Sequence, residues 1–118
     1  MTTHLDTGSW GEEQAEHFLK SKGYTLLFKN YRYQHAEIDL IVEKGRLLVF
    51  VEVKTRRWTA FGLPETFVNA SKVRLLKKAA EHFIFEYDWK YDIRFDIISI
   101  LIQGQNKHSI HHIEDAFY

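Results

Sequence analysis

Residues 37–54, EIDLIVEKGRLLVFVEVK, contain two apolar runs that carry charged side chains inside them. Residues 37–42 and 47–54 predict two β-strands, and the four residues 43–46 between them predict the turn of a hairpin. Burial of an apolar strand stabilises a fold by about 25 cal/mol per Å², whereas an unpaired carboxylate there costs several kcal/mol. A bound divalent metal would compensate these charges.

The even length of the turn predicts which side chains of the hairpin share a face. It pairs odd positions with even ones, so Asp39 is expected on the same side as Glu52 and Lys54, together with Glu37. The opposite side is expected to enter the core. Its members are Ile38, Leu40, Val42, Val49, Val51 and Val53.

Helical periodicity occurs on both sides of the hairpin. Residues 9–12 have the spacing of a capping box, and the helix that they begin is expected to end near Gly23. Asn69 or Ser71 can cap a second helix that continues to about Tyr87.

Further strands are expected over residues 24–33, 91–102 and 108–113, with a long loop over residues 55–66. The segment between the third and fourth strands is long enough for a crossover to a parallel strand. The sequence therefore predicts the α/β class, with a mixed sheet and the order α-β-β-β-α-β followed by an added C-terminal strand.

The composition is that of one packed domain of 118 residues, in which residues 1–8 are expected to form a flexible tail. There is no cysteine, so a disulfide framework and a thiolate metal site are excluded. No stretch resembles a leader or a membrane span, and a cytoplasmic location is the expectation. Sixteen basic and sixteen acidic residues give no net charge, which is unusual for a protein that coats a duplex.

Asp39 and the run Glu52-Val53-Lys54 have the form D…ExK. Hydrolysis of a phosphodiester needs Mg²⁺ or a similar hard cation held by oxygen ligands. Asp39, Glu52 and the Val53 carbonyl would be those ligands, and Lys54 would orient or deprotonate the attacking water. The alternative is that Glu52 and Lys54 are ordinary solvent-facing charges of a half-exposed strand.

The combination EIDLI…FVEVKTR is far more specific than the bare D…ExK form, and it resembles the small bacterial YraN-type family. That family belongs to the restriction-endonuclease-like superfamily, whose signature is written PD-(D/E)XK; Ile38 stands where the signature has proline. The resemblance implies an α-β-β-β-α-β core, a cytoplasmic location, and cleavage of nucleic acid that depends on Mg²⁺ or Mn²⁺. Further matching positions are Gly8, Glu12, Ala15, Leu19, Gly23, Tyr24, Asn30, Gly62, Lys72, Arg94, Phe95 and Asp96.

Two more carboxylates gain roles from this resemblance. Glu12 would complete the metal site from the first helix, or it would only close the capping box. Glu37 would orient Lys54 or a water at the metal, or it would be an ordinary strand charge.

A basic and aromatic segment follows directly after Lys54. Thr55, Arg56, Arg57 and Trp58 could contact phosphates and stack on an unpaired base, and Lys72 could extend this face. Otherwise they form a solvated loop with one apolar anchor. For Arg94 and Asp96 a structural ion pair is the favoured interpretation.

The leading hypothesis is a metal-dependent nuclease that acts on DNA, branched or partly single-stranded. The rival is a nucleic-acid-binding or adaptor module that keeps the nuclease fold without turnover. The lack of net charge and the small surface favour a partner or a homodimer.

Overall fold

The computed structural model describes residues 7–58 and 68–117. Its elements are, in order, α1 (Thr7–Ser21), β1 (Thr25–Tyr33), β2 (Ala36–Lys44), β3 (Leu47–Arg57), α2 (Ala70–Tyr87), β4 (Asp92–Gly104) and β5 (Lys107–Ile113). The predicted α/β class and the predicted order of helices and strands are confirmed.

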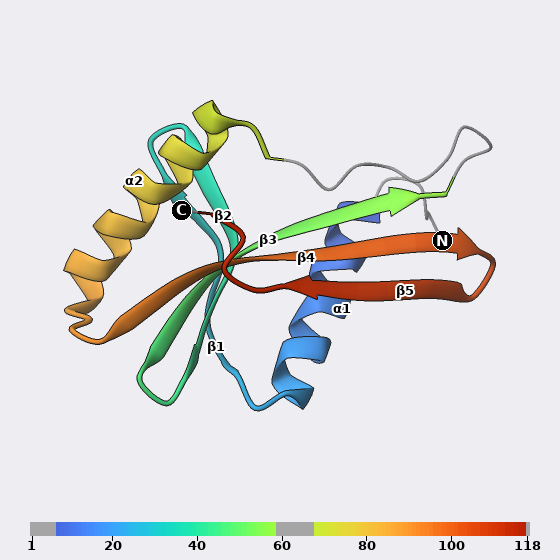
Figure 1. Cartoon of the computed structure of the whole chain (residues 1–118), viewed down its shortest axis with the longest axis horizontal. Coiled ribbons are helices and arrows are strands. Elements are labelled where there is room, and N and C mark those ends of the chain that lie inside the picture. The colour runs from blue at the N-terminus through green and yellow to red at the C-terminus, as the bar shows by residue number, and fades with distance from the viewer. Residues whose placement is uncertain (1–6, 59–67, 118) are drawn as a thin grey trace.

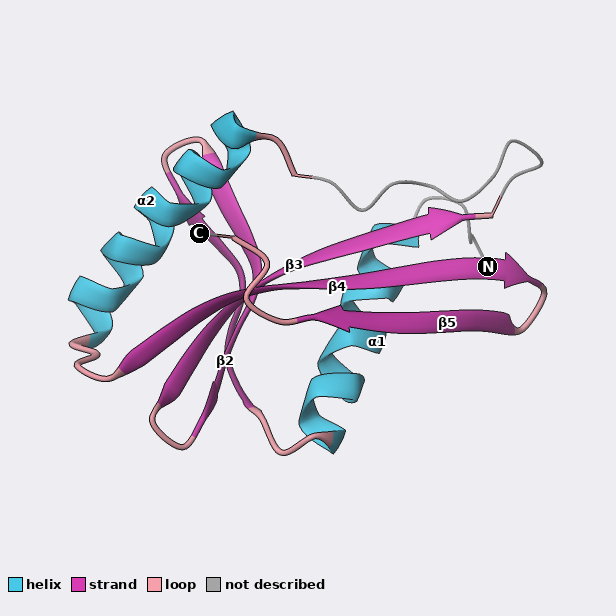
Figure 2. Ribbon diagram, in the orientation of Figure 1, coloured by secondary structure: helices cyan, strands magenta, loops and turns pink. Residues whose placement is uncertain are grey.

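One five-stranded mixed sheet forms the centre of the molecule, with the strand order β1-β2-β3-β4-β5 (Figure 1). Neighbouring strands are antiparallel except β3 and β4, which are parallel as predicted. The chain between these two strands contains α2, because a parallel pair needs a long crossover connection. Figure 2 shows how strongly the sheet twists from one end to the other.

The helices cover opposite faces of the sheet. α2 buries Leu76 against Phe50 in one apolar cluster, whereas α1 buries Ala15 and Leu19 against Val49 in a second. The four-residue spacing of Ala15 and Leu19 places both side chains on one side of α1. Neither helix is long and apolar enough to cross a membrane.

α1 begins earlier than the sequence predicts. It starts at Thr7, so Ser9 and Glu12 both lie inside the helix and the predicted capping box does not form. The last two residues of the expected tail are therefore helical. The predicted end is confirmed: Gly23 has a φ of +95°, and its N–H donates to the Lys20 carbonyl at 3.0 Å.

The β2–β3 hairpin pairs odd positions with even ones, as predicted, but its turn is shorter. Lys44 pairs with Leu47, which leaves only Gly45 and Arg46 in the turn instead of four residues. Gly45 has a φ of +61°, a conformation that favours glycine in two-residue hairpin turns.

The side chains of β2 switch from one side of the sheet to the other where Asp39 lies opposite Asn30 of β1. The pairing of the two strands skips both residues, and Asn30 has a φ of +53°. As a result Ile38 packs in the α2 cluster, whereas Leu40 packs in the α1 cluster. The prediction that Ile38 shares a face with Leu40 is wrong, because simple alternation fails at this kink.

β3 is longer than predicted, because β4 pairs with it as far as Arg57. Residues 55–57 are therefore strand rather than the start of a loop. The rest of the predicted loop, from residue 59 onward, lies outside the described residues.

Candidate functional site

A pocket of about 290 Å³ opens where β2 and β3 diverge. Their pairing ends at Leu40 and Val51, so the next residues of the two strands stand apart. α1, β2, β3 and α2 all contribute to the walls. The charged side chains that line the pocket are Glu12, Asp39, Glu52, Lys54, Arg56 and Lys72.

Asp39 points across the gap towards β3. Its Oδ2 accepts a hydrogen bond from the Val53 N–H at 2.7 Å. Burial and the nearby Glu52 carboxylate raise the pKa of Asp39 to about 7, although the Val53 N–H opposes this. Two carboxylates that repel each other in a half-buried pocket are arranged for a cation.

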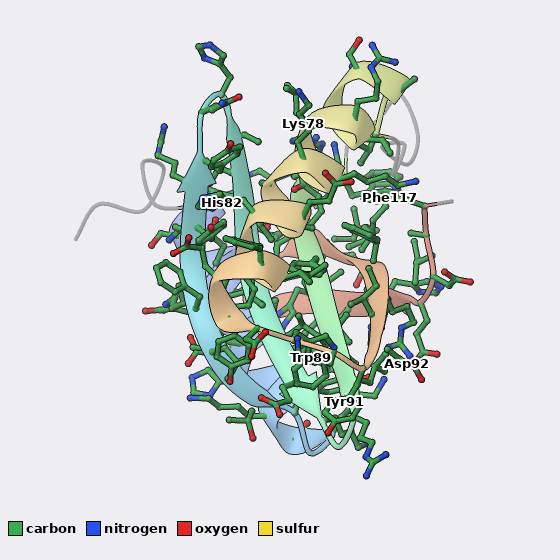
Figure 3. The ribbon with its side chains drawn as sticks, turned by 90° about the vertical axis from the view of Figure 1, so that its left-hand side faces the viewer. Lys78, His82, Trp89, Tyr91, Asp92 and Phe117 are labelled. Carbon is green, nitrogen blue, oxygen red and sulfur yellow. The ribbon has the colours of Figure 1, made fainter. Side chains whose placement is uncertain are left out.

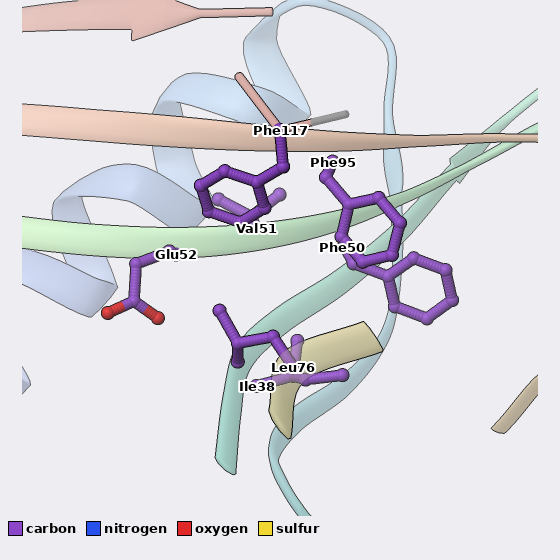
Figure 4. Close-up of a pocket in the computed structure, with 7 residues that line it drawn as sticks. All are labelled: Ile38, Phe50, Val51, Glu52, Leu76, Phe95 and Phe117. Atoms are coloured by element: carbon purple, nitrogen blue, oxygen red, sulfur yellow. The ribbon is translucent and has the colours of Figure 1, made fainter. Parts of the chain in front are cut away.

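Glu52 is the most buried of the pocket carboxylates, with 6% of the residue exposed. Its Oε2 accepts from Lys72 Nζ at 2.6 Å. Apolar side chains surround a small cavity of about 10 Å³ beside it (Figure 4). Lys72 reaches Glu52 from the first turn of α2, where the Asn69 side chain caps the helix by accepting from the Lys72 N–H at 2.9 Å.

Lys54 lies on the same side of β3 as Glu52, as alternation predicts. Burial and the neighbouring cations Lys72 and Arg56 lower the pKa of Lys54. A lysine with a lowered pKa loses its proton more readily and is suited to act as a base.

The Val53 carbonyl is directed into the same gap. In a strand the N–H and C=O of one residue point to the same edge, and the Val53 N–H donates to Asp39. The pocket therefore contains an oxygen from the backbone besides those of Asp39 and Glu52.

Glu12 and Glu37 are linked through Asn30, a contact that the sequence did not predict. When the Asn30 amide is oriented to satisfy its neighbours, its nitrogen donates to Glu12 Oε1 at 3.1 Å and to Glu37 Oε2 at 3.0 Å. Burial raises the pKa of Glu12, against the hydrogen bond from Asn30. Glu37 also accepts from Arg32 at 3.4 Å. The role of Glu37 in orienting Lys54 or a water at the metal stays a prediction, and the structure adds a connection from Glu37 to Glu12.

The predicted nucleic-acid contacts are only partly brought together. Thr55 lines the pocket, but its hydroxyl is buried against Gly11 of α1, where an added methyl group would overlap it. Arg56 lines the pocket, whereas Arg57 is the next residue of the strand and points to the opposite side. Trp58 is 51% exposed just after β3.

Mg²⁺ and Mn²⁺ fit the chemistry of these donors. Among residues 7–58 and 68–117, no three acidic or histidine side chains converge into a complete metal cage. Mg²⁺ does not require one, because it commonly binds one or two carboxylates and keeps its other positions for water and phosphate. Asp39, Glu52 and the Val53 carbonyl match that requirement.

Arg94 and Asp96 form the predicted structural ion pair, with Arg94 Nη2 at 2.7 Å from Asp96 Oδ2. Asp96 is fully buried, and its carboxylate also contacts the His112 ring and accepts from the Asp115 N–H. Arg94 in addition donates to the Tyr24 hydroxyl at 2.9 Å.

The sequence reasoning missed two features of the pocket. It assigned no function to Asn30, although an asparagine within a strand is a signal for a left-handed backbone position. It also did not pair Lys72 with Glu52, because twenty residues separate them and no local pattern joins them.

The fold and the pocket define an α/β protein in which two strands and two helices bring carboxylates and lysines together at one gap in a mixed sheet. Residues 11–100 match the family described as "Uncharacterised protein family UPF0102", and the chain belongs to this family. It is 44% identical over 118 residues to a UPF0102 protein of Flavobacterium psychrophilum. The matched region covers 100% of this chain and 98% of the relative. A UPF0102 protein of Syntrophomonas wolfei is 44% identical over 113 residues, or 95% of this chain and 97% of the relative.

Proposed function

We propose that the chain is a divalent-metal-dependent nuclease of the restriction-endonuclease-like PD-(D/E)XK superfamily, which hydrolyses phosphodiester bonds in branched or partly single-stranded DNA. The observation that supports this proposal is the convergence of Asp39, Glu52 and Lys54 at the gap between β2 and β3. The element order of that superfamily is also the order of this chain. A cytoplasmic location is part of the proposal.

In this proposal Asp39, Glu52 and the Val53 carbonyl hold Mg²⁺ or Mn²⁺, and Glu12 approaches the same ion from α1. The ion would supply positive charge that stabilises the transition state at phosphorus. The Val53 N–H fixes the Asp39 carboxylate in the gap at 2.7 Å, so its orientation is set before any ion arrives.

Lys54 Nζ would take the proton from the attacking water. Its lowered pKa favours this step, because a neutral amine is needed to accept a proton. Arg56 and Lys72 would contact the phosphates on either side of the cleaved bond. Lys72 must leave Glu52 to do so, since the two side chains are paired.

A second candidate is a nucleic-acid-binding or adaptor module that keeps the fold without turnover. The Lys72–Glu52 ion pair favours it, because a lysine at 2.6 Å already neutralises the carboxylate that would bind the metal.

A cleavage assay separates the two candidates. Branched DNA, DNA with single-stranded tails and plain duplex would be incubated with the protein and Mg²⁺, Mn²⁺ or EDTA. We expect metal-dependent cleavage that Lys54→Ala lowers by at least about 100-fold, while the circular dichroism spectrum is unchanged. Lys78→Ala, an exposed lysine of α2, is the matched control. Unchanged cleavage by the Lys54 variant would contradict the nuclease, and absence of cleavage on every DNA would favour the adaptor.

A further inference from the structure

A second hollow, of about 520 Å³, lies between the edge strand β1 and the C-terminal half of α2. Its volume is in the usual range for a ligand site. Aromatic rings from both elements line it, with Arg32 and Glu86 among the charged residues. We call this hollow the aromatic groove and define it by Phe28, Tyr31, Phe83 and Tyr87.

The four rings form a row in which each touches the next. Ring centroids are 5.3 Å apart for Phe28 and Tyr31, 5.2 Å for Tyr31 and Phe83, and 5.2 Å for Phe83 and Tyr87. The ends of the row are the exposed rings, Phe28 at 46% and Tyr87 at 45%. Two half-exposed rings therefore flank two that are more deeply buried, an arrangement that offers a planar ligand stacking surfaces.

His82 fixes the inner part of the groove. Its Nδ1 lies 2.7 Å from the Tyr31 hydroxyl, and its ring stacks on Tyr33 with centroids 4.1 Å apart. Figure 3 shows His82 on the side of α2 that faces β1 and β2. The groove is thus held in place without a ligand.

A chain of contacts connects the aromatic groove with the carboxylate pocket. Arg32 lines the groove and donates to Glu37 at 3.4 Å. Glu37 accepts from Asn30, and Asn30 also donates to Glu12, which lines the pocket. A nucleic-acid strand bound at the pocket can therefore pass Arg32, whose side chain is 75% exposed and whose long 3.4 Å contact with Glu37 a phosphate can replace.

We propose that the aromatic groove binds an unpaired base of the nucleic acid whose phosphate enters the carboxylate pocket; this inference rests on the proposed function. Bases stack on aromatic side chains regardless of sequence. Glu86 at the groove can accept from an exocyclic amino group of the base. A base inside an intact duplex is already stacked and paired, so the groove selects DNA with unpaired nucleotides beside the cleaved bond.

The test measures binding in EDTA, so that it does not depend on cleavage. The probe is a short single-stranded oligodeoxynucleotide that carries 2-aminopurine, whose fluorescence falls when it stacks, compared with the same probe in a full duplex. We expect quenching with the single strand and little with the duplex. Equal quenching in both would overturn the proposal.

Variants locate the binding surface. Phe28→Ala and Tyr87→Ala should each weaken binding of the single strand about fivefold or more. Tyr91→Ala is the matched control, because Tyr91 is an aromatic residue that is 55% exposed and lies outside the groove. Phe28→Leu keeps the apolar surface but loses the ring, so it should also weaken binding. Full binding by Phe28→Leu, or equal loss in Tyr91→Ala, would overturn the assignment.

Light scattering distinguishes a bound base from a second copy of the chain in the groove. A comparison of quenching with cleavage tests the base-binding groove and the proposed nuclease separately. A dimer in light scattering that Phe28→Ala converts to a monomer would overturn the inference, because a second copy would then cover the groove. Quenching without any metal-dependent cleavage would support the groove and contradict the proposed nuclease. Cleavage without quenching would overturn the groove alone.

Discussion

Lys72→Met tests whether the ion pair with Glu52 compensates a buried charge. Loss of one partner of a fully buried pair costs about 3–5 kcal/mol, whereas an exposed pair contributes about 0–1 kcal/mol. The Glu52 side chain is 7% exposed and the Lys72 side chain 46%, so the pair lies between these limits. We expect the variant to lose about 1–2 kcal/mol of the free energy of unfolding.

Thermal unfolding followed by circular dichroism measures this loss, first in EDTA and then with Mg²⁺ or Mn²⁺. A loss of this size lowers the Tm of a domain of about 100 residues by roughly 4–16 °C. A metal that binds only the folded state raises its stability. Because the ion would take the place of the Lys72 ammonium beside Glu52, the difference between the variant and the unaltered protein should shrink in the metal.

Lys78→Met is the control, since Lys78 is an exposed lysine of the same helix. It should change neither the Tm in EDTA nor the shift with metal. Lys72 does not compensate Glu52 if Lys72→Met is as stable as the control in EDTA, or if Mg²⁺ and Mn²⁺ stabilise the variant and the unaltered protein by the same amount.

Gly11→Ala should destabilise the protein by about 1–2 kcal/mol, because overlap with the Thr55 hydroxyl outweighs the gain in helix propensity. Urea unfolding measures this loss. The second substitution Thr55→Ala should largely remove it. Asp96→Asn should cost about 3 kcal/mol at pH 7. Burial alone would raise the pKa of Asp96, but the hydrogen bonds from the Arg94 guanidinium hold this pKa below its usual value. The stability from Asp96 is therefore present above its unfolded pKa of about 4 and is lost as the pH falls further, so variant and unaltered protein should converge in acid unfolding. Asn30→Ala should weaken Mn²⁺ binding in calorimetry by releasing Glu12; an unchanged affinity would contradict this link.

The sequence predicts the elements of this fold better than their limits. The alternation of apolar residues predicts that odd positions of the hairpin pair with even ones, because a one-residue slip would exchange the two faces. It does not predict the register itself, since the turn has two residues instead of four. The end of β3 is not predicted either, because Arg56 and Arg57 belong to the strand only through their pairing with β4. Likewise Ile38 changes face at a kink that depends on the left-handed backbone of Asn30 on the neighbouring strand.

The sequence also predicts only some of the contacts in the candidate site. Asp39, Glu52 and Lys54 could be grouped from spacing because one hairpin carries all three. Glu12 was placed only through resemblance, and its contact with Asn30 joins a helix to an edge strand, which no local pattern records. The partner of Glu52 comes from α2, so it became visible only in three dimensions.

Anomalous diffraction from crystals soaked in Mn²⁺ tests the proposed metal site. We expect a Mn²⁺ peak between Asp39 and Glu52, in contact with the Val53 carbonyl, and Lys72 displaced from Glu52. No peak at that gap, with the Lys72–Glu52 ion pair still intact, would contradict it.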